Sequence, residues 1–112
     1  MVSRELIAAT TRPLVLAVLA KGENYGYAII QQVRELSGGE LDWSEGMLYP
    51  VLHRLEQDKL IIGRWSKSES GRKRKYYRLS ASGTRAIQAE RRQWFTVHQT
   101  LESLWGPKSC LS

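Results

Sequence analysis

The 112-residue sequence has few of the residues that covalent cross-links and metal sites require. Cys110 is the only cysteine, so no disulfide can form within the chain, and a reducing compartment is the simplest environment. Cys110 is third from the end, which excludes a C-terminal prenylation motif. The histidines, His53 and His98, are far apart in the sequence, and no acidic, histidine and cysteine residues share metal-ligand spacing. We therefore expect no metal.

Catalytic and membrane-spanning patterns are also missing from the sequence. It has no glycine-rich phosphate loop, no nucleophile elbow and no convincing catalytic triad, so we expect neither an enzyme nor a cofactor. The apolar run at residues 13–20 is far too short to cross a bilayer. With basic residues before it, this run crudely resembles a secretory signal core, but the amphipathic helical pattern continues through it. We expect a cytoplasmic protein without membrane contact.

The excess positive charge is confined to one segment. The chain has 17 basic and 11 acidic residues, which gives a net charge of +6. Residues 64–79 alone carry +6, because seven basic residues there face one acid, Glu69. The seven are Arg64, Lys67, Arg72, Lys73, Arg74, Lys75 and Arg78. A polar, glycine-containing tip lies between two β-forming runs, which predicts a hairpin. A small hairpin with this charge suits contact with a phosphate backbone.

Two helices are predicted before residue 40. The first covers residues 3–20, and Pro13 favours a break near Thr11, which would cap the restarted helix. The second covers residues 25–36, with Asn24 as its cap. The apolar side chains at helical spacing in this second helix are Ile29, Ile30, Val33 and Leu36.

A third helix, the hairpin and a last helix follow. Ser44 is the predicted cap of a helix over residues 45–58, which Pro50 is expected to bend. The strands are predicted at residues 60–67 and 72–79, with Tyr77 and Leu79 facing inward. The outward residues are then Arg74, Tyr76 and Arg78. The last helix begins at Ser80 or Ser82 and ends near residue 105, where Gly106 and Pro107 stop it.

This order predicts a mainly α protein with a small β-hairpin. Three helices followed by a basic hairpin form a winged helix-turn-helix, in which the third helix recognises DNA and the hairpin is the wing. We expect one compact domain with a DNA-binding region at residues 1–80 and a long C-terminal dimerisation helix at residues 81–106. Residues 107–112 are expected to form a flexible tail.

The exposed face of the third helix is a candidate DNA-binding surface. Glu45, Tyr49 and His53 form an i, i+4, i+8 row, with Gly46 and Arg54 beside it. Gly46 would allow close approach of the backbone, Tyr49 would place its hydroxyl on a phosphate, and Arg54 would contact a phosphate rather than a base. Taken alone, such a row is as often a solvated surface as a DNA-binding one. The neighbouring basic wing is what favours DNA.

The wing has the size and charge for a minor groove. Ser70 and Gly71 keep its tip small, and Arg72, Lys73 and Arg74 supply charge at the base of the tip. These contacts would be mostly independent of sequence. The alternative is a charged edge strand that prevents aggregation, which would explain two or three of the charges but hardly seven.

Four sequence motifs resemble the PadR family of bacterial transcriptional regulators over about residues 10–105. They are Tyr-Gly-Tyr-Ala-Ile at 25–29, Gly-Met-Leu-Tyr-Pro-Val-Leu-His-Arg-Leu-Glu at 46–56, Gly-Arg-Lys-Arg-Lys-Tyr-Tyr-Arg-Leu-Ser at 71–80, and Gly83. The resemblance implies a dimeric repressor of neighbouring genes, often genes for transporters or detoxifying enzymes. It also implies DNA contacts at Tyr25, Ser44, Glu45, Gly46, Tyr49 and the wing. The single C-terminal helix is similar to that of the compact subfamily.

The last helix has an apolar stripe that predicts a homodimer. Ile87, Trp94 and Leu101 are spaced by seven residues, and Val97 and Leu104 occupy the second heptad position. Glu90 interrupts that second position, so the coiled-coil pattern is partial. The first helix would contribute Leu6 and Ile7 to the interface. The alternative is that the stripe packs on its own domain, but the helix is longer than so small a body can cover.

Trp94 also has a role implied by the resemblance. In some compact PadR proteins a tryptophan at the matching point lines a cavity between subunits and stacks on flat drug-like ligands. Trp94, Phe95 and His98 are therefore candidate effector-binding residues, while the alternative is that Trp94 is only interface core. Two other functions stay open: a winged helix that binds an acidic protein partner, and a sensor whose principal partner is an aromatic ligand.

Overall fold

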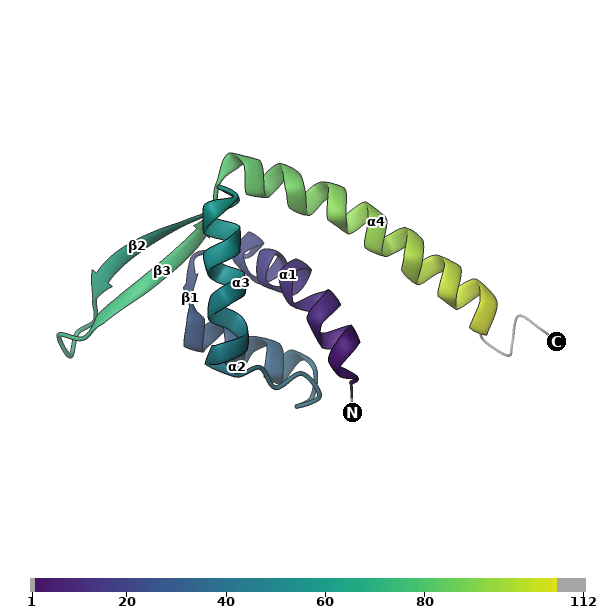
Figure 1. The fold of residues 1–112 in the computed structure, drawn as a ribbon, viewed down its shortest axis with the longest axis horizontal. Coiled ribbons are helices and arrows are strands. Elements are labelled where there is room, and N and C mark those ends of the chain that lie inside the picture. Colours follow the sequence, from purple (N-terminus) through teal and green to yellow (C-terminus); the bar gives the residue numbers. More distant parts are fainter. Residues whose placement is uncertain (1, 107–112) are drawn as a thin grey trace.

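The structure, a computed structural model, describes residues 2–106. Its elements are α1 (Arg4–Ala20), β1 (Asn24–Tyr25), α2 (Gly26–Leu36), α3 (Glu45–Gln57), β2 (Ile61–Lys67), β3 (Lys73–Leu79) and α4 (Ala81–Trp105). The first three helices form the body, the hairpin β2–β3 projects from one side, and α4 extends past the other (Figure 1). The predicted fold class, mainly α with a winged helix-turn-helix, is confirmed. The predicted tail at residues 107–112, with Cys110, lies outside the described residues.

Helix α1 is continuous through Pro13, so the predicted break is wrong. Thr11 does not cap a second segment. Its side chain is buried, and its hydroxyl donates a hydrogen bond to the carbonyl of Ile7 at 2.7 Å. The proline removes one internal hydrogen bond, and burial of Val15 and Leu16 in the next turn offsets that cost.

The sheet has a third strand that was not predicted. Asn24 and Tyr25 form β1, which pairs antiparallel with β3 and gives the strand order β1-β3-β2. Helix α2 therefore begins at Gly26, and the prediction that Asn24 caps a helix starting at Tyr25 is wrong: the Asn24 side chain accepts a hydrogen bond from the N–H of Tyr25 instead. Ile29, Ile30 and Val33 of the predicted apolar spacing are buried, whereas Leu36, in the last turn of α2, is 78% exposed.

The hairpin has the predicted boundaries to within one residue and a regular register from Ile61 opposite Leu79 to Lys67 opposite Lys73. Tyr77 is buried and Leu79 packs against the core, as predicted. Arg78 is exposed as expected. Arg74 and Tyr76 on the same face are only half-exposed, since the side chain of Tyr25 from β1 lies against both.

The first turn of α4 packs closely against the residues just before β2. Ser80, one of the two predicted caps, accepts a hydrogen bond from the N–H of Gly83 at 3.0 Å and donates its hydroxyl to the carbonyl of Lys59 at 2.7 Å. A Cβ atom on Gly83 would lie 2.0 Å from the carbonyl oxygen of Leu60, so only glycine fits there. From this point α4 continues for 25 residues, about 37 Å at 1.5 Å per residue.

Tyr77 gives the fold a specific sensitivity to alkali. Burial, with smaller contributions from the nearby Glu56 and Tyr49, raises the pKa of Tyr77 from 10.0 to about 12. Because the folded pKa is the higher one, this tyrosine stabilises the fold fully below pH 10 and progressively less as the pH rises towards about 12.

We expect wild-type stability to fall in that alkaline window more steeply than that of a Tyr77→Phe variant, which has no proton to lose there. Denaturant titrations at several pH values measure both slopes. If the free energy of unfolding fell equally with pH in the two proteins, Tyr77 would have an ordinary pKa in the folded state.

Candidate nucleic-acid interface

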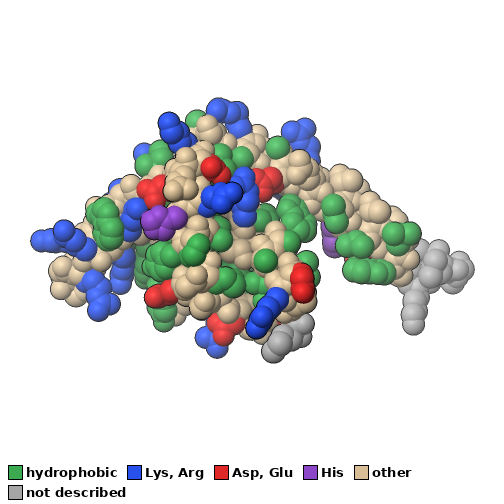
Figure 2. Space-filling model, in the orientation of Figure 1, with side chains coloured by type: hydrophobic (Ala, Val, Ile, Leu, Met, Phe, Trp, Pro, Cys, Tyr) green, Lys and Arg blue, Asp and Glu red, His purple; other side chains and the backbone are tan. Residues whose placement is uncertain are grey.

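A groove of about 630 Å³ lies between α3 and the hairpin β2–β3, hereafter the wing. Six predicted DNA-binding residues line it together: Tyr25, Glu45, Tyr49, Arg72, Lys73 and Arg74. They come from β1 just before α2, from the first half of α3, and from the wing near its tip. Basic side chains gather at the projecting end of the wing (Figure 2). The groove therefore has one wall from the recognition helix and one basic wall.

The other predicted DNA-binding residues lie outside this groove. Ser44 caps α3 with its hydroxyl, and Gly46 is exposed in the first turn, where a Cβ atom would meet only Ser44 Oγ, at 3.9 Å. Arg54 is exposed in the last turn of α3. Ser70 and Gly71 are exposed at the wing tip, where Gly71 adopts φ of 83°. These five residues face solvent around the groove rather than inside it.

Two basic residues of the wing are already paired with acids of the body, which the sequence did not indicate. Arg64 donates from Nε to Glu23 Oε2 at 2.8 Å, and this contact lowers the pKa of Glu23. Lys75 donates to Glu56 Oε1 of α3 at 3.0 Å. Once these acids and Glu69 are counted, the local charge is +4 rather than the predicted +6. The remaining excess is concentrated towards the wing tip.

The helix-turn-helix positions two tyrosines of the groove. The ring of Tyr49 lies over Gly26, because a Cβ atom there would be 2.7 Å from the tyrosine Oη and 3.0 Å from Cζ. Tyr25 lies under the guanidinium of Arg74, which is 4.2 Å from the ring centroid, and its ring meets Tyr76 edge-on at 5.4 Å. Tyr25 therefore ties the wing to the start of α2.

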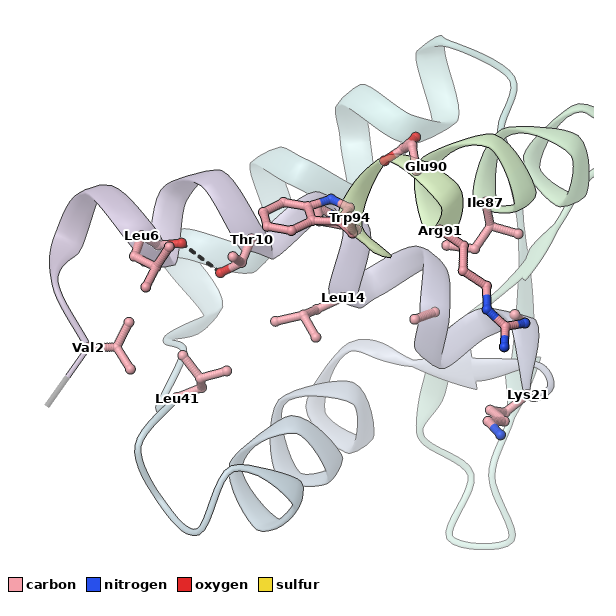
Figure 3. A pocket seen from close by; sticks show the side chains of 13 residues that line it. Val2, Leu6, Thr10, Leu14, Lys21, Leu41, Ile87, Glu90, Arg91 and Trp94 are labelled. Atoms are coloured by element: carbon pink, nitrogen blue, oxygen red, sulfur yellow. Dashed lines mark hydrogen bonds between the residues drawn. The ribbon is translucent and has the colours of Figure 1, made fainter. Parts of the chain in front are cut away.

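A second groove, of about 720 Å³, lies between α1 and α4 (Figure 3). It is mostly apolar, and it contains Leu6, Ile87 and Trp94 of the predicted dimerisation residues. Ile7 instead packs partly against its own core. The remaining three, further along α4, are exposed: Val97 (50%), Leu101 (37%) and Leu104 (78%).

Of the three candidate effector-binding residues, only Trp94 lines the second groove. It lines this groove together with Leu6 and Thr10 of α1 (Figure 3). Phe95 and His98 are exposed on α4 and are not among the lining residues. One protomer therefore does not bring the three together.

Glu90, which interrupts the heptad pattern, has a partner within the protomer. Arg12 of α1 donates from Nη2 to Glu90 Oε2 at 3.2 Å, and its Nη1 lies 4.0 Å from Asp58. Glu90 therefore joins α4 to α1 and does not belong to the apolar stripe.

Residues 15–89 match the family described as the "Transcriptional regulator PadR-like family". The chain belongs to the PadR family. It is 37% identical over 89 residues to a Mycobacterium tuberculosis protein named transcriptional regulator Rv3488, covering 80% of this chain and 79% of that one. Its fold matches the crystal structure of a PadR-like transcriptional regulator from Bacillus cereus with a TM-score of 0.81 and 28% identity, covering 92% and 98% of the two chains. PadR proteins are transcription factors, so this chain is not an enzyme.

The groove of this PadR protein also contains residues that sequence reasoning missed. His53 was placed on the exposed row of α3 and Lys75 was counted in the charge of the wing, but neither was among the predicted contacts. Tyr27 and Trp65 were overlooked. For two of them a signal existed. Tyr77 faces inward, so strand alternation puts Lys75 on the same face, and the antiparallel register puts Trp65 opposite Lys75.

Within residues 2–106, no three histidine, cysteine or acidic side chains are grouped as metal ligands. None of the helices described for the PadR chain has the length and apolarity needed to span a membrane.

Gly26→Ala should reduce DNA binding by about tenfold, because the added methyl group displaces the ring of Tyr49. Stability should change little, since the methyl group would displace only the outer part of the ring of Tyr49, which is 37% exposed. Duplex titrations and thermal melts measure the two effects. A double-mutant cycle with Tyr49→Ala is the control. If Gly26→Ala weakened binding equally with Tyr49 absent, the effect would not act through that ring.

Proposed function

We propose that this PadR protein is a homodimeric repressor that covers an inverted-repeat operator near the genes it controls and is released by an aromatic small molecule. The observation that carries the proposal is the groove between the first half of α3 and the basic wing. Because bacterial DNA lies in the cytoplasm, the proposal also locates the protein there.

Helix α3 enters the major groove and the wing enters the adjacent minor groove. Tyr49 and Glu45 face the duplex from the groove wall, while Ser44 and Gly46 allow the start of α3 to approach closely. Arg54 contacts the phosphate backbone from the last turn. Tyr25, with Arg72, Lys73 and Arg74 of the wing, holds the intervening phosphates, and Ser70 and Gly71 form the small tip.

Dimerisation is supported by the apolar residues that α4 leaves exposed. Trp94 is 39% exposed, Leu101 37% and Leu104 78%, and the groove between α1 and α4 is apolar and open. In an isologous dimer, α4 of each protomer covers this surface on the other. Two recognition helices about 34–36 Å apart then read half-sites one DNA turn apart.

Release by an effector is supported by the place of Trp94 in that same groove. A flat ligand that stacks on Trp94, with Phe95 and His98 supplied across the interface, favours one arrangement of the two protomers. The ligand lowers operator affinity only if it binds the arrangement with mismatched helix separation more tightly. Quenching of tryptophan emission by planar aromatic compounds, lost in a Trp94→Ala variant, tests this step.

A titration with random duplex DNA at increasing salt tests DNA binding itself. The proposal predicts binding at low salt that weakens steeply as salt is added, because several phosphate contacts release counterions. A winged helix that serves only as a protein-interaction module would show negligible binding even at low salt, and that result would refute the proposal.

A further inference from the structure

Trp65 is an exposed indole in the middle of the wing, and its one ring contact described within residues 2–106 is with the ammonium of Lys75. Its side chain is 66% exposed, although tryptophan is one of the side chains that gain most from burial. It lines the groove between α3 and the wing, on the wall opposite Tyr49 and His53. An aromatic side chain in this position needs a partner that enters the groove.

The register fixes the direction in which Trp65 points. Ile61 is buried, so the alternate residues Gly63, Trp65 and Lys67 of β2 share the face that looks towards α3. Trp65 is paired with Lys75, whose ammonium is 5.9 Å from the indole and 3.0 Å from Glu56 of α3. The Lys75–Glu56 bridge joins β3 of the wing to α3. Trp65 lies next to it, before the basic residues at the tip.

The geometry of a duplex identifies what can occupy this space. If α3 lies in the major groove and the wing in the adjacent minor groove, the ridge between the two grooves passes between α3 and the wing. That ridge is the sugar–phosphate backbone of one strand. It presents apolar deoxyribose rings flanked by phosphate oxygens. The apolar face of an indole can pack against the deoxyribose, and its single N–H can donate to a phosphate oxygen.

We propose that Trp65 is a DNA contact that packs against the deoxyribose of the strand held between α3 and the wing and donates its Nε1–H to an adjacent phosphate. This inference rests on the proposed DNA binding and adds to it a contact that carries no charge. It gives the wing two separable contributions to binding. The basic tip supplies salt-dependent affinity, and Trp65 supplies salt-independent affinity that is the same for every sequence.

Trp65→Ala should therefore lower affinity for operator and random duplexes by the same factor, roughly five- to tenfold, the order expected for uncovering one face of an indole. The slope of log affinity against log salt should not change, since no cation is removed. Trp65→Phe should retain part of the affinity, because its ring still packs but has no N–H. Duplex binding should also change the emission of the wild type and not that of Trp65→Phe.

The matched control is Ile62→Ala. Ile62 is 40% exposed on the same strand but on the opposite face. It should bind both duplexes like the wild type. Thermal melts of all three variants show whether the wing is intact, since loss of an exposed side chain should leave stability nearly unchanged.

The outcomes separate the two proposals. If the wild type binds duplexes and Trp65→Ala binds them equally well, the Trp65 contact is wrong and the proposed function stands. A reduced salt slope in Trp65→Ala, or an equal loss in Ile62→Ala, also refutes the contact, because the effect would then come from a displaced wing. If the wild type itself binds no duplex, both proposals fail.

Discussion

Replacing Leu101 with aspartate should convert the proposed dimer into monomers and lower operator affinity by about a hundredfold or more. Leu101 lies seven residues after Trp94 on the apolar stripe of α4 and is 37% exposed in the isolated protomer. Two-fold symmetry places two such carboxylates in one interface, and each loses its hydration with no cation to compensate. A monomer contacts one half-site, so it loses the second set of DNA contacts.

Sedimentation of the variant and duplex titration measure the two parts of this prediction. Ser103→Asp is the matched control, because it adds the same charge two residues later on α4, outside the heptad positions of the stripe. It should remain dimeric and bind like the wild type. A Leu101→Asp protein that sediments as a dimer would show that the stripe is not the interface.

The second large effect should come from replacing Arg72 and Lys73 together with alanine. Both are exposed beside the wing tip and line the groove. If each contacts one phosphate, the slope of log affinity against log salt should fall by about 1.8, at about 0.9 per contact. Affinity at low salt should drop by about tenfold to a hundredfold for every sequence, since phosphates carry no sequence information.

The control removes the same charge from another element. Arg85 and Arg92 are exposed on α4, away from the groove. An Arg85→Ala, Arg92→Ala variant has the same net charge as the wing variant and should keep nearly all of the wild-type salt slope. Equal losses in the two variants would mean that net charge, not the wing, attracts the duplex.

The parts of the fold that depend on short-range sequence were predictable. Ser44 and Ser80 cap helices because their hydroxyls accept N–H groups three residues later. The two strands of the hairpin follow from a polar tip between two β-forming runs, and the inward position of Tyr77 follows from alternation. Each of these features depends on interactions between residues that are close together in the sequence.

The features that could not be predicted from the sequence depend on contacts between residues far apart in the chain. Strand β1 has only two residues and exists because β3 lies beside it. The pairing of Arg64 with Glu23 joins residues 41 positions apart, so the available charge of the wing could not be counted from the sequence. The continuity of α1 through Pro13 likewise depends on core packing. Strand pairing could have placed Trp65 beside Lys75, but the groove that this face of the wing forms with α3 is seen only in the tertiary structure.

The central claim is that a symmetric pair of these protomers binds DNA with α3 and the wing. Selection of bound sequences from a random duplex pool tests this claim most directly. The account predicts enrichment of one inverted repeat whose half-site centres are about 10–10.5 base pairs apart. An enriched site without dyad symmetry, or no retention of duplexes at low salt, would contradict it.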